Sequence, residues 1–123
     1  MDVHRFGKAV LDDLNPLHRE LRRAIPDVYK GFAELHQASL GPGALDVKTK
    51  ELMAFAIAVA DHCDGCIASH AGAAAHAGAT RQEAAEAIGV AILMNGGPAT
   101  IYGPRAFAAF CEFADIRDTK ASA

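Results

Sequence analysis

The sequence has no apolar run long enough to cross a bilayer. Hydrophobic types make up 51% of its 123 residues, yet the longest such run covers residues 52–60. A membrane helix needs roughly 20 apolar residues. The first eight residues, MDVHRFGK, alternate charged and apolar groups and lack the apolar core and cleavage site of a secretory signal. We therefore expect a cytoplasmic protein with no membrane partner.

The chain also has little excess of either charge and no strand-forming patterns. Its formal net charge is −3, and no stripe of Lys and Arg interleaved with aromatic residues is present, so nucleic acid is not an expected partner. Runs of β-branched residues with period-two alternation are absent. These features predict a single all-α domain over residues 1–123, a bundle of about six to seven helices. Its apolar content exceeds what a 12.9 kDa monomer readily buries, which predicts a homo-oligomer.

Proline, glycine and capping residues divide the chain into expected helices. Asn15-Pro16 predicts one helix start, Ile25-Pro26 predicts a break before a second helix, and residues 40–43 predict a loop. A central helix should begin after Asp46, run to Ala60 and be buried, because it is apolar nearly all round. Asp61 is the expected cap of the next helix, which contains both neighbouring cysteines and ends near Gly78. Thr80 and Glu83 have capping-box spacing before a helix over residues 84–94. After residues 95–98 a last helix follows, and residues 117–123 should fray.

Cysteine is scarce, but two of the three lie close together. Cys63 and Cys66 form a Cys-x-x-Cys pair at an expected helix start, where unpaired backbone N–H groups stabilise thiolates. An odd count in a reducing compartment argues against a structural disulfide framework, so the pair is interpreted as catalytic or metal-binding. Cys111, among Ala and Phe on the last helix, is expected to be a small buried residue.

Helical spacing brings two further residues to this pair. Cys63, Cys66 and His70 share one stripe, because residues three and four apart lie on one helix face. If the central helix and the cysteine helix form an antiparallel hairpin, Glu51 comes within about one turn of His70. These four residues are the candidate catalytic set: Glu51 orients the imidazole, His70 takes the proton of Cys66, and Cys63 is the resolving thiol. Asp64 would oppose a thiolate, although its side chain is expected to point away.

Each candidate also has a simpler interpretation. The pair could be half of a zinc site that His70 completes with His62 or His76, but structural zinc needs four ligands and no second Cys-x-x-Cys exists. We therefore favour redox chemistry. Taken alone, Glu51 is as readily a surface residue as a member of a relay. The remaining histidines, His4, His18 and His36, are expected at the surface or at an interface.

Together these motifs resemble a known family. The pattern comprises Glu51, Cys63-x-x-Cys66, His70, Thr80-x-x-Glu83 and Gly96-Gly97-Pro98. It is similar to the carboxymuconolactone decarboxylase family, and within it to the alkylhydroperoxidase D-like branch, over about residues 45–98. The resemblance implies a helical bundle that forms trimers or hexamers. It also implies that Cys66 attacks the peroxide and Cys63 resolves the product. The best-known alkylhydroperoxidase D proteins carry a second histidine where this sequence has Gly65, so that part of their proton path is missing.

We therefore expect a thiol-dependent peroxidase or disulfide oxidoreductase that reduces hydroperoxides through the Cys63/Cys66 pair. An external dithiol, or a thioredoxin- or lipoyl-type reductant, would restore the pair, and no bound cofactor or metal is needed. Two alternatives stay open. One is a γ-carboxymuconolactone decarboxylase-like lyase in which His70 and Glu51 handle protons. The other is a non-enzymatic helical module that senses redox state.

Overall fold

The computed structural model describes residues 3–122 and is helical almost throughout. The elements are η1 (Val3–Arg5), α1 (Lys8–Ala24), α2 (Pro26–Leu40), α3 (Val47–Ala60), α4 (Asp64–His76), α5 (Arg81–Asn95) and α6 (Gly97–Ser122). No strand occurs within these residues. The predicted all-α class is confirmed.

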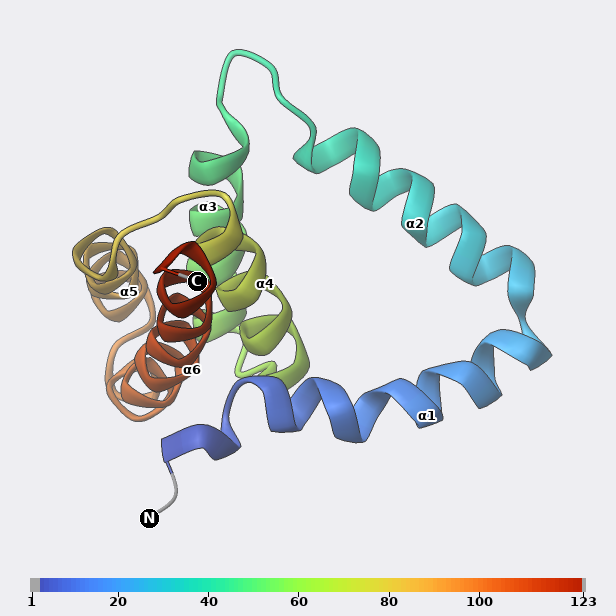
Figure 1. The fold of residues 1–123 in the computed structure, drawn as a ribbon, viewed down its shortest axis with the longest axis horizontal. Coiled ribbons are helices and arrows are strands. Elements are labelled where there is room, and N and C mark those ends of the chain that lie inside the picture. The colour runs from blue at the N-terminus through green and yellow to red at the C-terminus, as the bar shows by residue number, and fades with distance from the viewer. Residues whose placement is uncertain (1–2, 123) are drawn as a thin grey trace.

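The helices are arranged as a body and an arm (Figure 1). In the body, α3 packs against α4 and α5, and α6 packs against α4 and α5. The arm consists of α1 and α2. Figure 1 shows α1 leaving the foot of α4, turning at Ile25 and returning through α2 toward the loop that precedes α3. The arm contains no buried residue, so the core lies entirely in the body and its adjoining turns.

Small side chains allow the body helices to approach closely. Within residues 3–122, twelve alanines are buried, whereas the largest fully buried side chains are Phe55, Phe110 and Val59. The rings of Phe55 on α3 and Phe110 on α6 lie 6.2 Å apart between centroids at an interplanar angle of 54°. Such tilted aromatic pairs add stabilisation beyond the burial of their surface. The body therefore provides a tightly packed support for α3 and α4.

Most of the predicted helix boundaries are confirmed. Asp46 caps α3 by accepting a 2.8 Å hydrogen bond from the backbone N–H of Thr49. Thr80 and Glu83 form the complete capping box at the start of α5. Gly78 follows α4 with a φ of +95°, in the left-handed region that glycine adopts without strain. These boundaries were predictable because each depends on a few neighbouring residues.

The predicted helix start at Asn15-Pro16 is wrong, because α1 continues through both residues. Proline cannot donate the hydrogen bond that would reach the carbonyl of Asp12 one turn earlier. Asp12 is exposed, so water can satisfy that carbonyl and the helix is not forced to end. A proline with a capping residue before it is therefore an ambiguous start signal on a solvent-exposed helix.

Two further expectations need correction. The central helix α3 is not buried all round, since Met53 is 49% and Ile57 59% exposed. The segment predicted to fray is helical through Ser122, and Ala123 lies outside the described residues. Arg117 explains part of this order, because its guanidinium donates to the carbonyls of Ala75 and Ala79 at 2.9 and 2.7 Å. A long-range contact of this kind leaves no local sequence signal.

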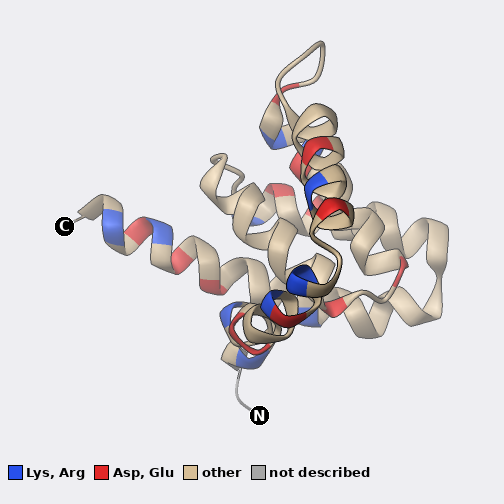
Figure 2. Cartoon of the chain, turned by 90° about the vertical axis from the view of Figure 1, so that its right-hand side faces the viewer, with Lys and Arg blue, Asp and Glu red and all other residues tan. Residues whose placement is uncertain are grey.

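The hydropathy and charge of the individual helices follow the composition of the whole sequence. Within residues 3–122, none of the helices is both long and apolar enough to span a bilayer. Figure 2 shows Lys and Arg alternating with Asp and Glu along the arm and near the end of α6. Charges of opposite sign therefore neighbour one another on these exposed helices.

Candidate active site

A carboxylate and an imidazole meet where α3 packs against α4. Glu51 Oε2 lies 2.7 Å from His70 Nδ1, and the Glu51 side chain is only 6% exposed. Because an ionised carboxylate only accepts hydrogen bonds, Nδ1 carries the proton in this pair. The lone pair of the neutral imidazole is then on Nε2. The arrangement fixes the tautomer of His70 and leaves Nε2 able to accept a proton.

The two neighbouring cysteines are bridged at the start of the same helix. Cys63 and Cys66 form a disulfide with a Cα–Cα separation of 5.2 Å, within the range usual for such bonds. Cys63 is the N-cap of α4, and its Sγ accepts a 3.3 Å hydrogen bond from the backbone N–H of Cys66. The predicted cap, Asp61, instead ends α3. The side chain that caps α4 is therefore the thiol-derived sulfur of Cys63 and not the predicted carboxylate of Asp61.

The accessibility of the cysteines differs. Cys66 is exposed, whereas Cys63 and His70 are half-buried. Cys66 lies one turn before His70 on α4, a spacing that puts both side chains on one helix face. The four candidate residues are thus gathered around the start of α4, with Glu51 held behind His70 by α3. Cys66 is therefore the more accessible residue of the bridged pair.

One residue of the site was missed by sequence reasoning. His36 was expected only at the surface or an interface, and it is exposed, but its ring stacks on His70 at 5.9 Å and 13°. It comes from α2, so the arm contributes to the surroundings of the site. Phe32, one turn earlier, lies 6.4 Å from the His36 ring. The only sequence signal for this contact was the apolar face of the arm helix on which His36 lies.

The arm comes close to Gly65, the position of the missing second histidine. A Cβ built on Gly65 would come within 2.9 Å of Leu14 Cδ1 on α1. A larger side chain there would have to displace Leu14. The absence of a histidine at this position therefore goes together with the close approach of α1 to the start of α4.

Three other histidines have contacts away from the Glu51–His70 pair. His62, with a φ of 56°, stacks on Tyr102 at 4.5 Å and 9°. His18 bonds to Tyr29 at 2.9 Å and His4 to Glu112 at 3.2 Å. Among residues 3–122, no group of three or more histidine, cysteine or acidic side chains is arranged to hold a metal ion.

Cys111 stands apart from the bridged pair. It lies on α6 with a free thiol and is half-buried, somewhat more accessible than the sequence predicted. Burial raises the pKa of the Cys111 thiol, with Arg81 acting in the opposite direction. A thiol of this kind is less reactive at neutral pH than an ordinary exposed cysteine.

Comparison with known proteins identifies the family of this chain. The model of the carboxymuconolactone decarboxylase family matches residues 26–113, most of the chain. The chain belongs to the carboxymuconolactone decarboxylase family. The matched range includes α2 to α5 and part of α6, so His36 and the four candidate residues all lie within it. The resemblance inferred from the motifs is thereby confirmed at the level of the family.

Solved structures and curated relatives agree with this assignment. A carboxymuconolactone decarboxylase family protein from Legionella pneumophila is 43% identical with a TM-score of 0.80, covering 84% of this chain and 92% of its own. A family protein from Thermotoga maritima, described with a suggested involvement in antioxidative response, is 29% identical with a TM-score of 0.78, covering 92% and 96%. An uncharacterized protein of Cupriavidus necator is 35% identical over 84% of this chain and 91% of its own.

Proposed function

We propose that this carboxymuconolactone decarboxylase family protein is a thiol-dependent peroxidase of the alkylhydroperoxidase D type. The observation that carries the proposal is the 2.7 Å Glu51–His70 pair placed one helical turn from a bridged Cys-x-x-Cys. A buried carboxylate that orients a histidine beside a thiol is the arrangement by which a nucleophile is activated. The antioxidative involvement suggested for the Thermotoga relative also supports this reaction class.

The reaction begins with both cysteines reduced. His70 Nε2 takes the proton from Cys66 Sγ, while Glu51 stabilises the imidazolium that forms. The Cys66 thiolate attacks one oxygen of a hydroperoxide, the O–O bond breaks, and the leaving alkoxide takes the proton back from His70 and departs as an alcohol. Cys66 is then a sulfenic acid. Cys63 Sγ attacks it, water leaves, and the disulfide of this structure results.

An external dithiol then reduces the disulfide by two thiol–disulfide exchanges. The overall change is one hydroperoxide and one dithiol converted to an alcohol, water and an oxidised dithiol. A cycle of this kind needs a reducing compartment, which supports a cytoplasmic location.

Cysteine variants test this proposal. Cys66→Ser should abolish consumption of tert-butyl hydroperoxide, because the attacking sulfur is gone. Cys63→Ser should consume one equivalent and stop at a sulfenic acid on Cys66 that dimedone labels, as read by mass spectrometry. Cys111→Ser is the matched control and should turn over at the parent rate. Peroxide consumption by Cys66→Ser at the parent rate, with dimedone on Cys63, would reverse the assigned roles of the two thiols.

We also propose that the protein works as a homotrimer or homohexamer. The arm carries a row of apolar side chains that are 38–66% exposed: Leu17, Leu21, Ile25, Val28, Phe32 and Leu35. Helices with no buried residue gain little stability from packing within one chain, and a second copy offers matching apolar surface on the outer faces of α3 and α5. Sedimentation should show the oligomer at micromolar concentration. A monomer there would refute this proposal without affecting the peroxidase.

A further inference from the structure

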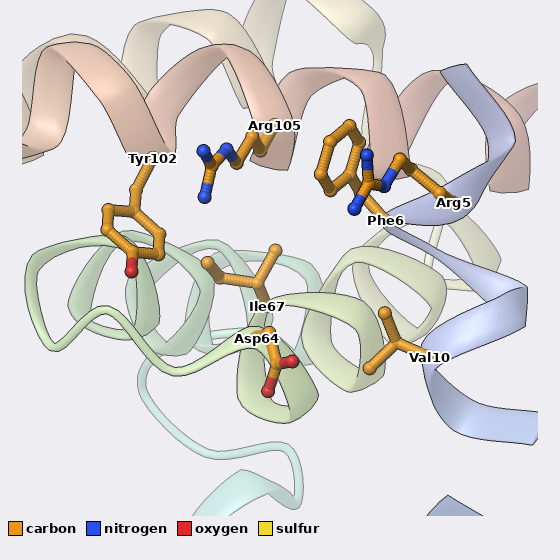
Figure 3. A pocket seen from close by; sticks show the side chains of 7 residues that line it. All are labelled: Arg5, Phe6, Val10, Asp64, Ile67, Tyr102 and Arg105. Carbon is orange, nitrogen blue, oxygen red and sulfur yellow. The ribbon is translucent and has the colours of Figure 1, made fainter. Parts of the chain in front are cut away.

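A cavity of about 200 Å³ lies beside the cysteine pair, where the beginning of the described chain, α4 and α6 come together (Figure 3). Two of the residues that line it come directly after a cysteine in the sequence. Asp64 follows Cys63, and Ile67 follows Cys66. Consecutive Cα atoms are about 3.8 Å apart, so the cavity lies alongside the start of α4, which carries the disulfide.

The cavity has two guanidinium groups on one side. Arg105 lies 5.3 Å from the centroid of the Tyr102 ring and 5.8 Å from that of Phe6, and Arg5 lies 5.3 Å from Phe6. Cation–π contacts of this kind hold the guanidinium groups in place. Within the described part of the chain, neither arginine forms an ion pair with a carboxylate. Their N–H donors are therefore available to a bound anion.

A single carboxylate lies on the other side. Figure 3 shows Asp64 and the guanidinium of Arg105 on opposite sides of Ile67. Asp64 Oδ1 accepts a 2.6 Å hydrogen bond from the backbone N–H of Gly65, and among residues 3–122 its Oδ2 has no partner. Ile67 lies between these charges, and Val10 and Phe6 add further apolar lining to the cavity. Its chemistry fits a ligand that has an anion, a cation and a short apolar body.

We propose that this cavity binds a low-molecular-weight thiol bearing amino-acid groups, with its carboxylate at Arg5 and Arg105 and its ammonium at Asp64, as reductant of the Cys63–Cys66 disulfide. The proposal rests on the proposed function, since it names the class of electron donor for the same redox pair. The opposite charges on the two sides of the cavity distinguish this class from purely anionic and purely cationic thiols.

The exchange proceeds in two balanced steps. The thiolate of the first donor attacks Cys63 Sγ, the Cys63–Cys66 bond breaks, and Cys66 leaves as a thiolate beside His70. A second donor thiolate attacks the donor sulfur of the mixed disulfide and releases Cys63. Two donor thiols become one donor disulfide, and the protein gains two electrons and two protons.

Four small thiols that differ in their charged groups test the contact at the arginines and the contact at Asp64 separately. The oxidised full-length protein is mixed with cysteine, 3-mercaptopropionate, cysteamine or 2-mercaptoethanol, at equal thiolate concentrations and without peroxide. Release of protein thiols is followed by quenching and mass spectrometry. Arg105→Gln should slow reduction about three- to fivefold with the two thiols that carry a carboxylate, the range for loss of an exposed charged contact. Asp64→Asn should slow it similarly with the two that carry an ammonium.

The controls decide between binding and a general effect. 2-Mercaptoethanol should reduce both variants within about twofold of the parent rate, since it carries neither charge. Arg22→Gln is the matched control, because Arg22 also stacks on a ring, that of Tyr29, but lies on the arm. It should leave all four rates unchanged. Equal slowing of all four thiols by Arg105→Gln or Asp64→Asn, or no slowing at all, would overturn the proposal. Loss of peroxide consumption with this charge selectivity intact would instead refute the peroxidase and leave the cavity assigned.

Discussion

The body and the arm of this protein place their apolar side chains in opposite ways. In the body, Phe55 and Phe110 are fully buried, whereas in the arm Phe32 is 66% and Leu35 62% exposed. The body therefore has the burial that stabilises a fold, and the arm has apolar surface that its own chain leaves uncovered. The candidate active site lies where the two regions meet. Its four proposed catalytic residues belong to α3 and the start of α4, while His36 reaches it from the arm.

The sharpest test of this contrast replaces one phenylalanine in each region. Phe55→Ala leaves a cavity in the core and should lower the free energy of unfolding by about 3–5 kcal/mol at any protein concentration. Phe32→Ala should cost under about 0.5 kcal/mol in dilute monomer, as exposed substitutions do. If a second copy covers the arm, its cost should grow with protein concentration. Urea unfolding at two concentrations measures both effects, and a concentration-independent loss for Phe32→Ala would contradict the distinction.

The second prediction concerns the buried carboxylate of the site. Glu51→Gln keeps the shape of the side chain but removes the charge that stabilises a protonated His70. The first oxidation of Cys66 should slow on the order of 10²-fold, as losses of general-base assistance do. Stopped-flow measurement of peroxide consumption by reduced protein gives this rate. Glu86→Gln, at an exposed glutamate of α5, is the control and should leave the rate unchanged. Oxidation of the Glu51 variant at the parent rate would remove the carboxylate from the mechanism.

The same contrast explains what the sequence could predict. Helix limits set by Asp46, by Thr80 with Glu83 and by Gly78 were predictable, because capping depends on residues within one turn. The meeting of Glu51 and His70 was also predictable. It needed only the 3.6-residue period and a tight turn between α3 and α4.

Contacts between regions were not predictable in this way. The stacking of His36 on His70 and the approach of Leu14 to Gly65 depend on where the arm lies relative to the body. The order of the α6 end depends on Arg117 reaching carbonyls about 40 positions earlier in the chain. No local propensity encodes such placements. The sequence therefore predicted the two end regions of the chain less accurately than its centre.

A smaller effect is expected where the arm touches the site. His36→Ala uncovers one face of the His70 ring, and the oxidation of Cys66 should slow roughly threefold, the loss associated with a weak aromatic contact. His36→Phe should restore the rate, because a flat ring again covers the imidazole. Gln37→Ala, at the next exposed residue of α2, is the control for changes in the arm itself. Equal rates for parent and His36→Ala would show that the arm does not act on the site.

The smallest expected effect concerns Cys111, the half-buried thiol outside the bridged pair. In a Cys63→Ser, Cys66→Ser double variant only Cys111 can be alkylated. Burial raises the pKa of this thiol, so the fraction present as thiolate at a given pH below it is lower than in an unfolded chain. The pH profile of iodoacetamide labelling should therefore have its midpoint above that of the same variant in denaturant. At neutral pH the native rate should be lower by less than about tenfold. Coincident profiles would show that α6 does not shield Cys111, and would remove the physical reason for its expected inertness beside the reactive pair.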